Sequence, residues 1–199
     1  MQTYLIIKEI FDKVVSIIFI IFFFPLFIIL ILFNLLLNGK PIFYIQERSG
    51  KNKKKINLIK LWTIKLDNDD LTKVKYTTLG LFFRKSGLDE IFQLFNILKG
   101  DLSLVGPRPL YMKYNDLYDD QQIIRLTVKP GLTGLAQIRQ HNDISWEQKI
   151  KYDLEYVEKM NLLLDIKIIL KTLYKVVQRI FDSNFLTISN EFKGNSKDE

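Results

Sequence analysis

Two short groups of residues carry side chains that suit phosphate chemistry. Asp89 and Glu90 are adjacent carboxylates at the start of a helical pattern, and Arg108 stands between Pro107 and Pro109. One carboxylate can act as a nucleophile while its neighbour, about 100° further round a helix, binds a metal ion. The positive helix end is expected to keep Asp89 ionised. The planar guanidinium of Arg108, on a backbone restricted by two prolines, suits bidentate binding of a phosphate. A helix-capping acidic pair and a structural arginine bridge would use the same residue types.

The elements that must position these groups follow from hydrophobic spacing. Apolar residues recur at helical spacing after Asp89, Ser86 and Asp89 form a capping-box sequence, and Gly100 is the expected helix stop. We predict a mixed α/β chain that is mostly helical with a small sheet. The further elements expected are strands within residues 42–46 and 56–66 and helices over 115–128, 145–159 and 162–181.

Composition limits the partners. The 199 residues suit one domain with an appended anchor, cysteine is absent, and the net charge of +7 favours an anionic partner. Standard nucleotide-binding loops are missing, a histidine triad would depend on His141 alone, and the acidic segment 67–70 lacks the glycine and distal glutamate of a calcium loop. We predict no nucleic-acid binding, because the basic residues of 162–181 alternate with aliphatic ones in an amphipathic helix.

An uncharged apolar run from Val14 to Leu37 is long enough to act as a membrane anchor. As a straight helix it would measure ~36 Å, and the mixed charges before it do not resemble a signal peptide. Pro25 lies near its middle and is expected to break or kink it. From these residues alone, a tilted spanning helix and a re-entrant hairpin both remain open.

The two chemical groups, taken with several others, resemble a known family. The chain is similar to the bacterial sugar transferases, the monotopic phosphoglycosyl transferases, and most like the minimal PglC-type members. The matching blocks are Leu88-Asp89-Glu90, Lys99-Gly100-Asp101, Val105-Gly106-Pro107-Arg108-Pro109 and Lys129-Pro130-Gly131-Leu132-Thr133-Gly134. Gly87 replaces the serine that is usual before Leu-Asp-Glu, so Ser86 is expected to cap the helix instead.

The resemblance implies a reaction. A sugar-1-phosphate would pass from a UDP-sugar to a polyprenol phosphate, undecaprenyl phosphate, with release of UMP and initiation of lipid-linked glycan assembly. Asp89 would attack and form an aspartyl-phosphosugar intermediate, and Glu90 would hold Mg²⁺. The residues expected to support substrate and phosphate binding are Arg108, Lys60, Arg84 and Asp153.

The resemblance also implies a location. Residues 1–38 would form a re-entrant membrane helix broken at Pro25, residues 39–181 the catalytic domain with its amphipathic helices, and residues 182–199 a polar tail. The protein would lie on the cytoplasmic face of the bacterial inner membrane, in contact with phospholipids, and its apolar helix faces are also compatible with a homo-oligomer. The alternative is a non-catalytic membrane scaffold for glycan-assembly enzymes.

Overall fold

The computed structural model describes residues 2–66, 74–139 and 144–181. Over these ranges the chain is mostly helical, as predicted, but three two-stranded sheets take the place of one small sheet. The β1–β2 and β3–β4 pairs are antiparallel, and the β5–β6 pair is parallel. The elements are, in chain order, α1 Gln2–Phe22, α2 Phe24–Asn38, β1 Phe43–Ser49, η1 Lys51–Lys53, β2 Lys55–Leu61, β3 Ile64–Leu66, β4 Val74–Tyr76, α3 Thr78–Ser86, η2 Leu88–Gln93, α4 Leu94–Lys99, β5 Ser103–Val105, η3 Met112–Tyr114, η4 Gln122–Leu126, β6 Gly131–Thr133, α5 Leu135–Arg139, α6 Trp146–Lys159 and α7 Leu162–Phe181, where η marks a 3₁₀ helix.

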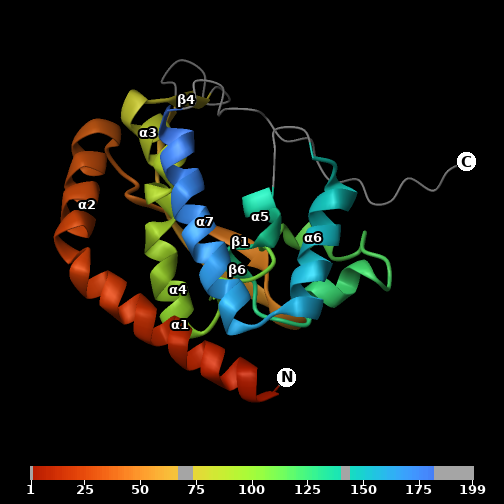
Figure 1. Cartoon of the computed structure of the whole chain (residues 1–199). Helices are drawn as coiled ribbons and strands as arrows, with labels where there is room; N and C mark the ends of the chain where they lie inside the picture. Colours follow the sequence, from red (N-terminus) through yellow and green to blue (C-terminus); the bar gives the residue numbers. More distant parts are fainter. Residues whose placement is uncertain (1, 67–73, 140–143, 182–199) are drawn as a thin grey trace, which may run out of the picture.

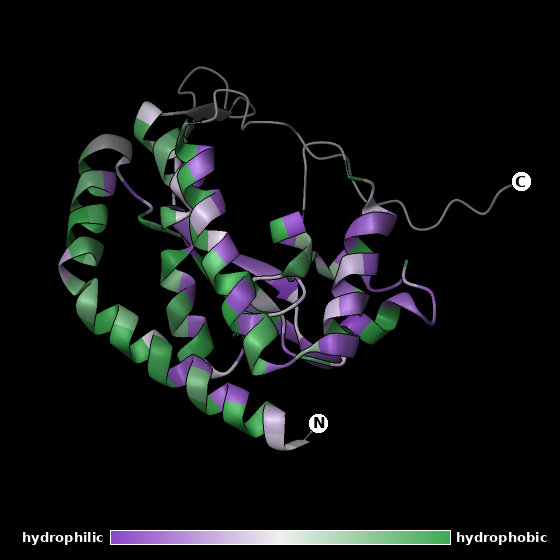
Figure 2. Ribbon diagram, in the orientation of Figure 1, coloured by the Kyte–Doolittle hydropathy of each residue, from purple (hydrophilic) through white to green (hydrophobic). Residues whose placement is uncertain are grey.

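Helices α1 and α2 form a bent arm around one side of the molecule (Figure 1). The arm is apolar over most of its length (Figure 2). Among the described residues no unbroken helix has the length and apolar character to cross a membrane, although the two arm helices meet that condition together, with a bend of 64° between them. The break falls at Phe23, and Pro25 lies in the first turn of α2. Proline fits that position because the amide there has no partner within the helix.

Polar side chains join the first half of the arm to the rest of the protein. The ammonium of Lys8 lies 2.6 Å from Oδ2 of Asp165 in α7, and the hydroxyl of Tyr4 donates to the same oxygen at 2.7 Å. The hydroxyl of Ser103 donates to Oδ2 of Asp12 at 2.6 Å. Lys8, Asp12 and Asp165 are all buried. The N-terminal turns of α1 are therefore part of the folded domain.

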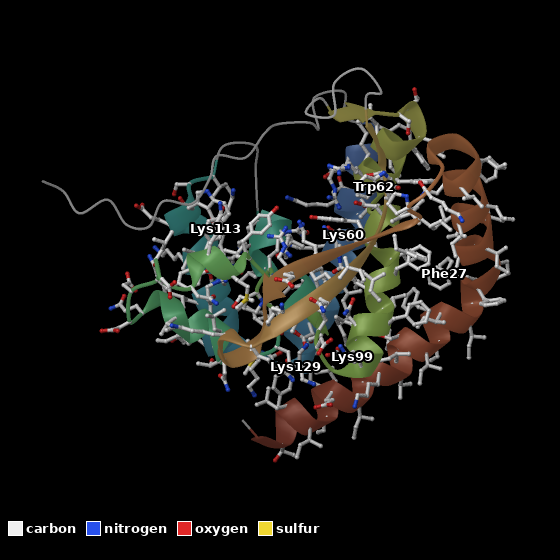
Figure 3. The ribbon with its side chains drawn as sticks, turned by 180° about the vertical axis from the view of Figure 1, so that it is seen from behind. Phe27, Lys60, Trp62, Lys99, Lys113 and Lys129 are labelled. Carbon is white, nitrogen blue, oxygen red and sulfur yellow. The ribbon has the colours of Figure 1, made fainter. Side chains whose placement is uncertain are left out.

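The second half of the arm joins the same domain through apolar packing. Phe27 and Leu30 of α2 are buried in the main core. The ring of Phe27 lies 5.0 Å from that of Phe92, on the side of α2 that faces α4 (Figure 3). The side-chain amide of Asn34 donates to the carbonyl of Ile42, just before β1. Both ends of the bent arm are thus attached to one body.

The β1–β2 hairpin brings Lys60 to the centre of the molecule (Figure 3). Ile56 and Leu58 are buried on one face of β2, and Lys60 follows them on that face because strand side chains alternate. This face packs on η2, so the ammonium of Lys60 is directed towards the residues that follow Gly87.

Close approach of two glycines holds the β5–β6 pair together. A Cβ atom on Gly131 would lie 2.0 Å from the amide nitrogen of Gly106, and one on Gly106 would lie 2.6 Å from the carbonyl oxygen of Lys129. Only glycine lets the two backbones come this close. The amide of Gly131 donates to the carbonyl of Pro107 at 3.0 Å, which ties the loop containing Arg108 to β6.

The predicted helices were partly confirmed. α-Helices form over Trp146–Lys159 and Leu162–Phe181, in agreement with two of the predictions. Gly100 ends α4 with a φ of 89°, as expected of the predicted helix stop. The helix expected over 115–128 was wrong, because that stretch holds only the 3₁₀ turn η4. There the carboxylate of Asp119 accepts hydrogen bonds from the backbone amides of Gln121 and Gln122, at 2.9 and 2.7 Å, in competition with helical bonding.

Candidate active site

A glycine turn presents the two carboxylates. Gly87 has a φ of 73°, and it both ends α3 and precedes η2, which carries Asp89 and Glu90 in its first turn. The expectation that Ser86 caps this helix was wrong. Its hydroxyl donates backwards to the carbonyls of Phe82 and Phe83, at 2.8 and 3.2 Å, because Ser86 is still the last residue of α3.

Two of the predicted cations meet on Glu90. The ammonium of Lys60 lies 2.6 Å from Oε1 of Glu90, and an Nη atom of Arg108 lies 3.2 Å from the same oxygen. The Lys60 and Glu90 side chains are 17% and 20% exposed, whereas Arg108 is 48% exposed. The guanidinium of Arg108 therefore reaches the carboxylate while part of it remains open to a ligand.

The pKa values of the two adjacent carboxyl groups are shifted in opposite directions. Burial, and then the negative charge of Glu90, raises the pKa of Asp89 to about 6. Burial alone would raise the pKa of Glu90 too, but the charges of Arg108 and Lys60 hold that pKa well below its usual range. The expected ionising effect of the helix end on Asp89 is outweighed by burial and by the charge of Glu90. Asp89 is thus ionised at neutral pH and more basic than a free aspartate.

Arg84, in the last turn of α3, is a third cation near Asp89. Its Nε donates to the hydroxyl of Thr63 at 2.9 Å, and its positive charge, after that of Lys60, opposes the rise in the pKa of Asp89. The structure thus brings Lys60, Arg84 and Arg108 together around the carboxylate pair.

A small hollow opens beside these residues. Three of its lining side chains are the cations Arg48, Lys60 and Arg108, and Glu90 supplies a single negative charge. The guanidinium carbon of Arg48 lies 3.4 Å from the ring centroid of Tyr111, whose hydroxyl accepts a hydrogen bond from Gln46. A site with this excess of positive charge suits an anion with more than one charge. Arg48 was not among the site residues predicted from the sequence, although it ends the Gln46-Glu47-Arg48 block that is similar to the family.

Asp153 does not join this group directly. It is 3% exposed, and its Oδ2 accepts from Nε and an Nη of Arg125, at 3.0 and 2.7 Å. Arg125 was missed in the sequence analysis, although an arginine within the apolar sequence Ile123-Ile124-Arg125-Leu126 is a signal of a paired, buried charge. The segment 67–70 and His141 lie outside the described residues.

Glu90 is the carboxylate expected to hold a magnesium ion. No three acidic or histidine side chains cluster within residues 2–66, 74–139 and 144–181. Magnesium in phosphate-transfer sites is commonly held by one or two carboxylates together with oxygens of the substrate, so such a cluster is not required. Both cation contacts of Glu90 are made by Oε1. Oε2 of this low-pKa carboxylate fits the role of a metal ligand.

Comparison with known proteins identifies the family. The sequence profile described as bacterial sugar transferase matches residues 3–179. This chain belongs to the bacterial sugar transferase family. The resemblance drawn from the carboxylate pair and the Gly-Pro-Arg-Pro loop is therefore confirmed.

The relatives of this family member are of two lengths. It is 45% identical to an uncharacterized sugar transferase of Bacillus subtilis, over 70% of this chain and 71% of the relative. It is 34% identical to the undecaprenyl-phosphate galactose phosphotransferase of Salmonella typhimurium, over 86% of this chain and 40% of that longer protein. It is 35% identical to the UDP-glucose:undecaprenyl-phosphate glucose-1-phosphate transferase of Klebsiella pneumoniae, over 84% of this chain and 39% of the relative.

Proposed function

We propose that this protein transfers a sugar-1-phosphate from a UDP-sugar to undecaprenyl phosphate and releases UMP. The observation that carries the proposal is the position of Asp89, a buried and unusually basic carboxylate, directly before Glu90, which lines a hollow together with Arg48, Lys60 and Arg108. The names of the Salmonella and Klebsiella relatives, which share about a third of its residues, support the same class of reaction.

In the first step an oxygen of Asp89 attacks the phosphorus that carries the sugar. A bond forms between that oxygen and phosphorus, and the bond from phosphorus to the bridging oxygen of the diphosphate breaks. UMP leaves with the electron pair, and the sugar-phosphate remains on Asp89. The cations of the hollow stabilise the charge that develops on the phosphoryl oxygens, which is the main source of catalysis in such transfers.

In the second step a phosphate oxygen of undecaprenyl phosphate attacks the same phosphorus. The bond between phosphorus and Asp89 breaks, the carboxylate is regenerated, and the product is a sugar diphosphate on the lipid. Glu90 and oxygens of the diphosphate would hold magnesium, which when bound supplies further neutralisation of phosphate charge. Lys60 and Arg108 keep Glu90 ionised for that purpose.

The proposal includes a location at the cytoplasmic face of the bacterial inner membrane, in contact with phospholipids. Ile21, Phe22 and Leu36 on the arm are 70%, 75% and 80% exposed, which is costly in water. Attachment of both ends of the arm to one domain supports a re-entrant arrangement, in which α1 and α2 enter and leave by the same leaflet.

The test is release of UMP from a panel of UDP-sugars with magnesium and undecaprenyl phosphate in detergent. We expect release by the wild type that depends on the lipid for repeated turnover. Asp89→Asn should abolish it, whereas Asp116→Asn, which changes an exposed aspartate, should leave it intact. Equal activity of Asp89→Asn and wild type would refute the mechanism. No release from any donor by folded, membrane-bound protein would favour the scaffold alternative.

A further inference from the structure

We propose that Arg125, held by Asp153 and Tyr118, is a positioning residue that fixes the backbone of Arg108 and so directs its guanidinium into the hollow. The consequence for catalysis rests on the proposed function, but the effect on anion binding does not. The proposal changes the role of Asp153 from a phosphate-binding residue to a support for Arg125.

The fork of Arg125 connects three separate segments. One Nη donates to the carbonyl of Arg108 at 2.7 Å and to Oδ2 of Asp153 at 2.7 Å, and the other donates to the hydroxyl of Tyr118 at 3.0 Å. Nε also donates to Asp153, at 3.0 Å. The Arg125 side chain is 1% exposed. Its donors lie on three nitrogens of one rigid plane and reach these acceptors at once, whereas the three donors of a lysine ammonium all lie on a single nitrogen.

Backbone hydrogen bonds hold the loop containing Arg108 before and after that residue, and the carbonyl of Leu110 accepts from the amide of Ser49 at 2.8 Å. The carbonyl of Pro107 already accepts from the amide of Gly131, and the amide of Gly106 donates to the carbonyl of Thr133. These bonds hold the start of the loop against β6. The next carbonyl, that of Arg108 itself, is the one that Arg125 binds. The peptide planes on both sides of the Arg108 Cα are therefore held from different directions.

Stability alone does not account for the buried ion pair of Arg125 and Asp153. A buried ion pair often contributes little net stability compared with apolar residues of the same volume. An apolar side chain at position 125 would fill the space, but it could not bind the carbonyl of Arg108. Besides its bonds to Asp153 and Tyr118, Arg125 thus supplies a connection to the loop that presents the guanidinium of Arg108.

The experiment compares Arg125→Met in the wild-type background with the same change in an Arg108→Ala background. The readouts are thermal unfolding, the affinity for inorganic pyrophosphate, and kcat and KM for UMP release. In the wild-type background we expect Arg125→Met to weaken pyrophosphate binding and kcat/KM by about 10- to 100-fold, since a displacement of about 1 Å can cost that much. In the Arg108→Ala background the loss should be below about threefold, because the group that Arg125 positions is gone. The decrease in Tm should be similar in both backgrounds.

Arg139→Gln is the matched control. Arg139 also pairs with an acidic residue of α6, Glu155, but the pair is more exposed. This change should leave pyrophosphate affinity and kcat/KM within about twofold of wild type. Should Arg125→Met fail to fold, Arg125→Lys makes the same comparison, with a smaller loss expected because the charge remains beside Asp153.

Equal fold-losses from the Arg125 change in both Arg108 backgrounds would overturn the inference, and so would unchanged pyrophosphate affinity in the wild-type background. Failure of the proposed function is a separate result. In that case the wild type releases no UMP from any donor, and pyrophosphate binding alone still decides whether Arg125 acts through Arg108.

Discussion

Replacement of Lys8 by methionine should destabilise the whole protein, because it breaks the buried joint between α1 and α7. The side chains of Lys8 and Asp165 are 9% and 1% exposed, and their charged atoms lie 2.6 Å apart. Methionine fills nearly the same volume without the charge. The variant therefore leaves the carboxylate of Asp165 in the interior without its cation.

The magnitude follows from what remains around Asp165. Removal of one partner of a buried ion pair costs about 3–5 kcal/mol. Tyr4 and Tyr156 still donate to the two oxygens of Asp165, each at 2.7 Å, so we expect the lower end of that range. At about 2–4 °C per kcal/mol for a chain of this length, a loss of about 3 kcal/mol lowers Tm by about 6–12 °C.

The assay is thermal unfolding in detergent, followed by tryptophan fluorescence. Lys13→Met is the matched control on the same helix, because Lys13 pairs with Glu9 at 2.9 Å while both side chains are more than 40% exposed. An exposed pair of this kind contributes about 0–1 kcal/mol. If Lys8→Met and Lys13→Met unfold within about 2 °C of each other, the reasoning about the buried joint is refuted. The double variant Lys8→Met with Asp165→Asn should recover part of the loss, since the uncompensated charge is then removed.

Two further predictions concern the site and the backbone that supports it. The rate of UMP release in the absence of acceptor should fall about tenfold per pH unit below about pH 6 and level off above it. The reason is that the pKa of Asp89 is raised and only the ionised carboxylate attacks. A pH profile of single-turnover rates that stays flat down to the ordinary pKa range of aspartate would contradict this. Gly131→Ala should lower Tm more than Gly39→Ala. A Cβ on Gly131 would lie 2.0 Å from the amide nitrogen of Gly106, whereas a Cβ on Gly39 meets nothing within 4 Å and the variant bears only the strain of a φ of 73°. Similar Tm values for the two variants would contradict the close packing of β5 and β6.

Local pattern was sufficient for some elements and not for others. The helices at Trp146–Lys159 and Leu162–Phe181 were predicted well because a long apolar period and flanking polar residues act within one segment. The stretch 115–128 has a similar composition, but the carboxylate of Asp119 accepts from the backbone amide of Gln122, and the residues that follow form a 3₁₀ helix. The capping role expected of Ser86 failed for a related reason, since α3 extends up to Ser86 itself.

Some residues of the candidate site could be predicted from local sequence, and others could not. Asp89, Glu90 and Arg108 were identified from their local sequence, because the carboxylate pair and the proline-bounded arginine are short motifs. Arg125 could not be given a role from its own segment. The role proposed for it rests on hydrogen bonds to a carbonyl 17 residues before it and a carboxylate 28 residues after it, which meet only in the folded chain.

The sequence by itself determined the family, the apolar run interrupted by a proline, and the residue types available for phosphate transfer, because each of these is a property of consecutive residues. Only the tertiary structure decided how those residues are used. Lys60, 30 positions before Glu90, and Arg108, 18 positions after it, converge on one carboxylate oxygen. Burial raises the pKa of Asp89, although its place near a helix start suggested the opposite. Burial and long-range charge pairing both depend on segments far apart in the chain, and no local pattern contains them.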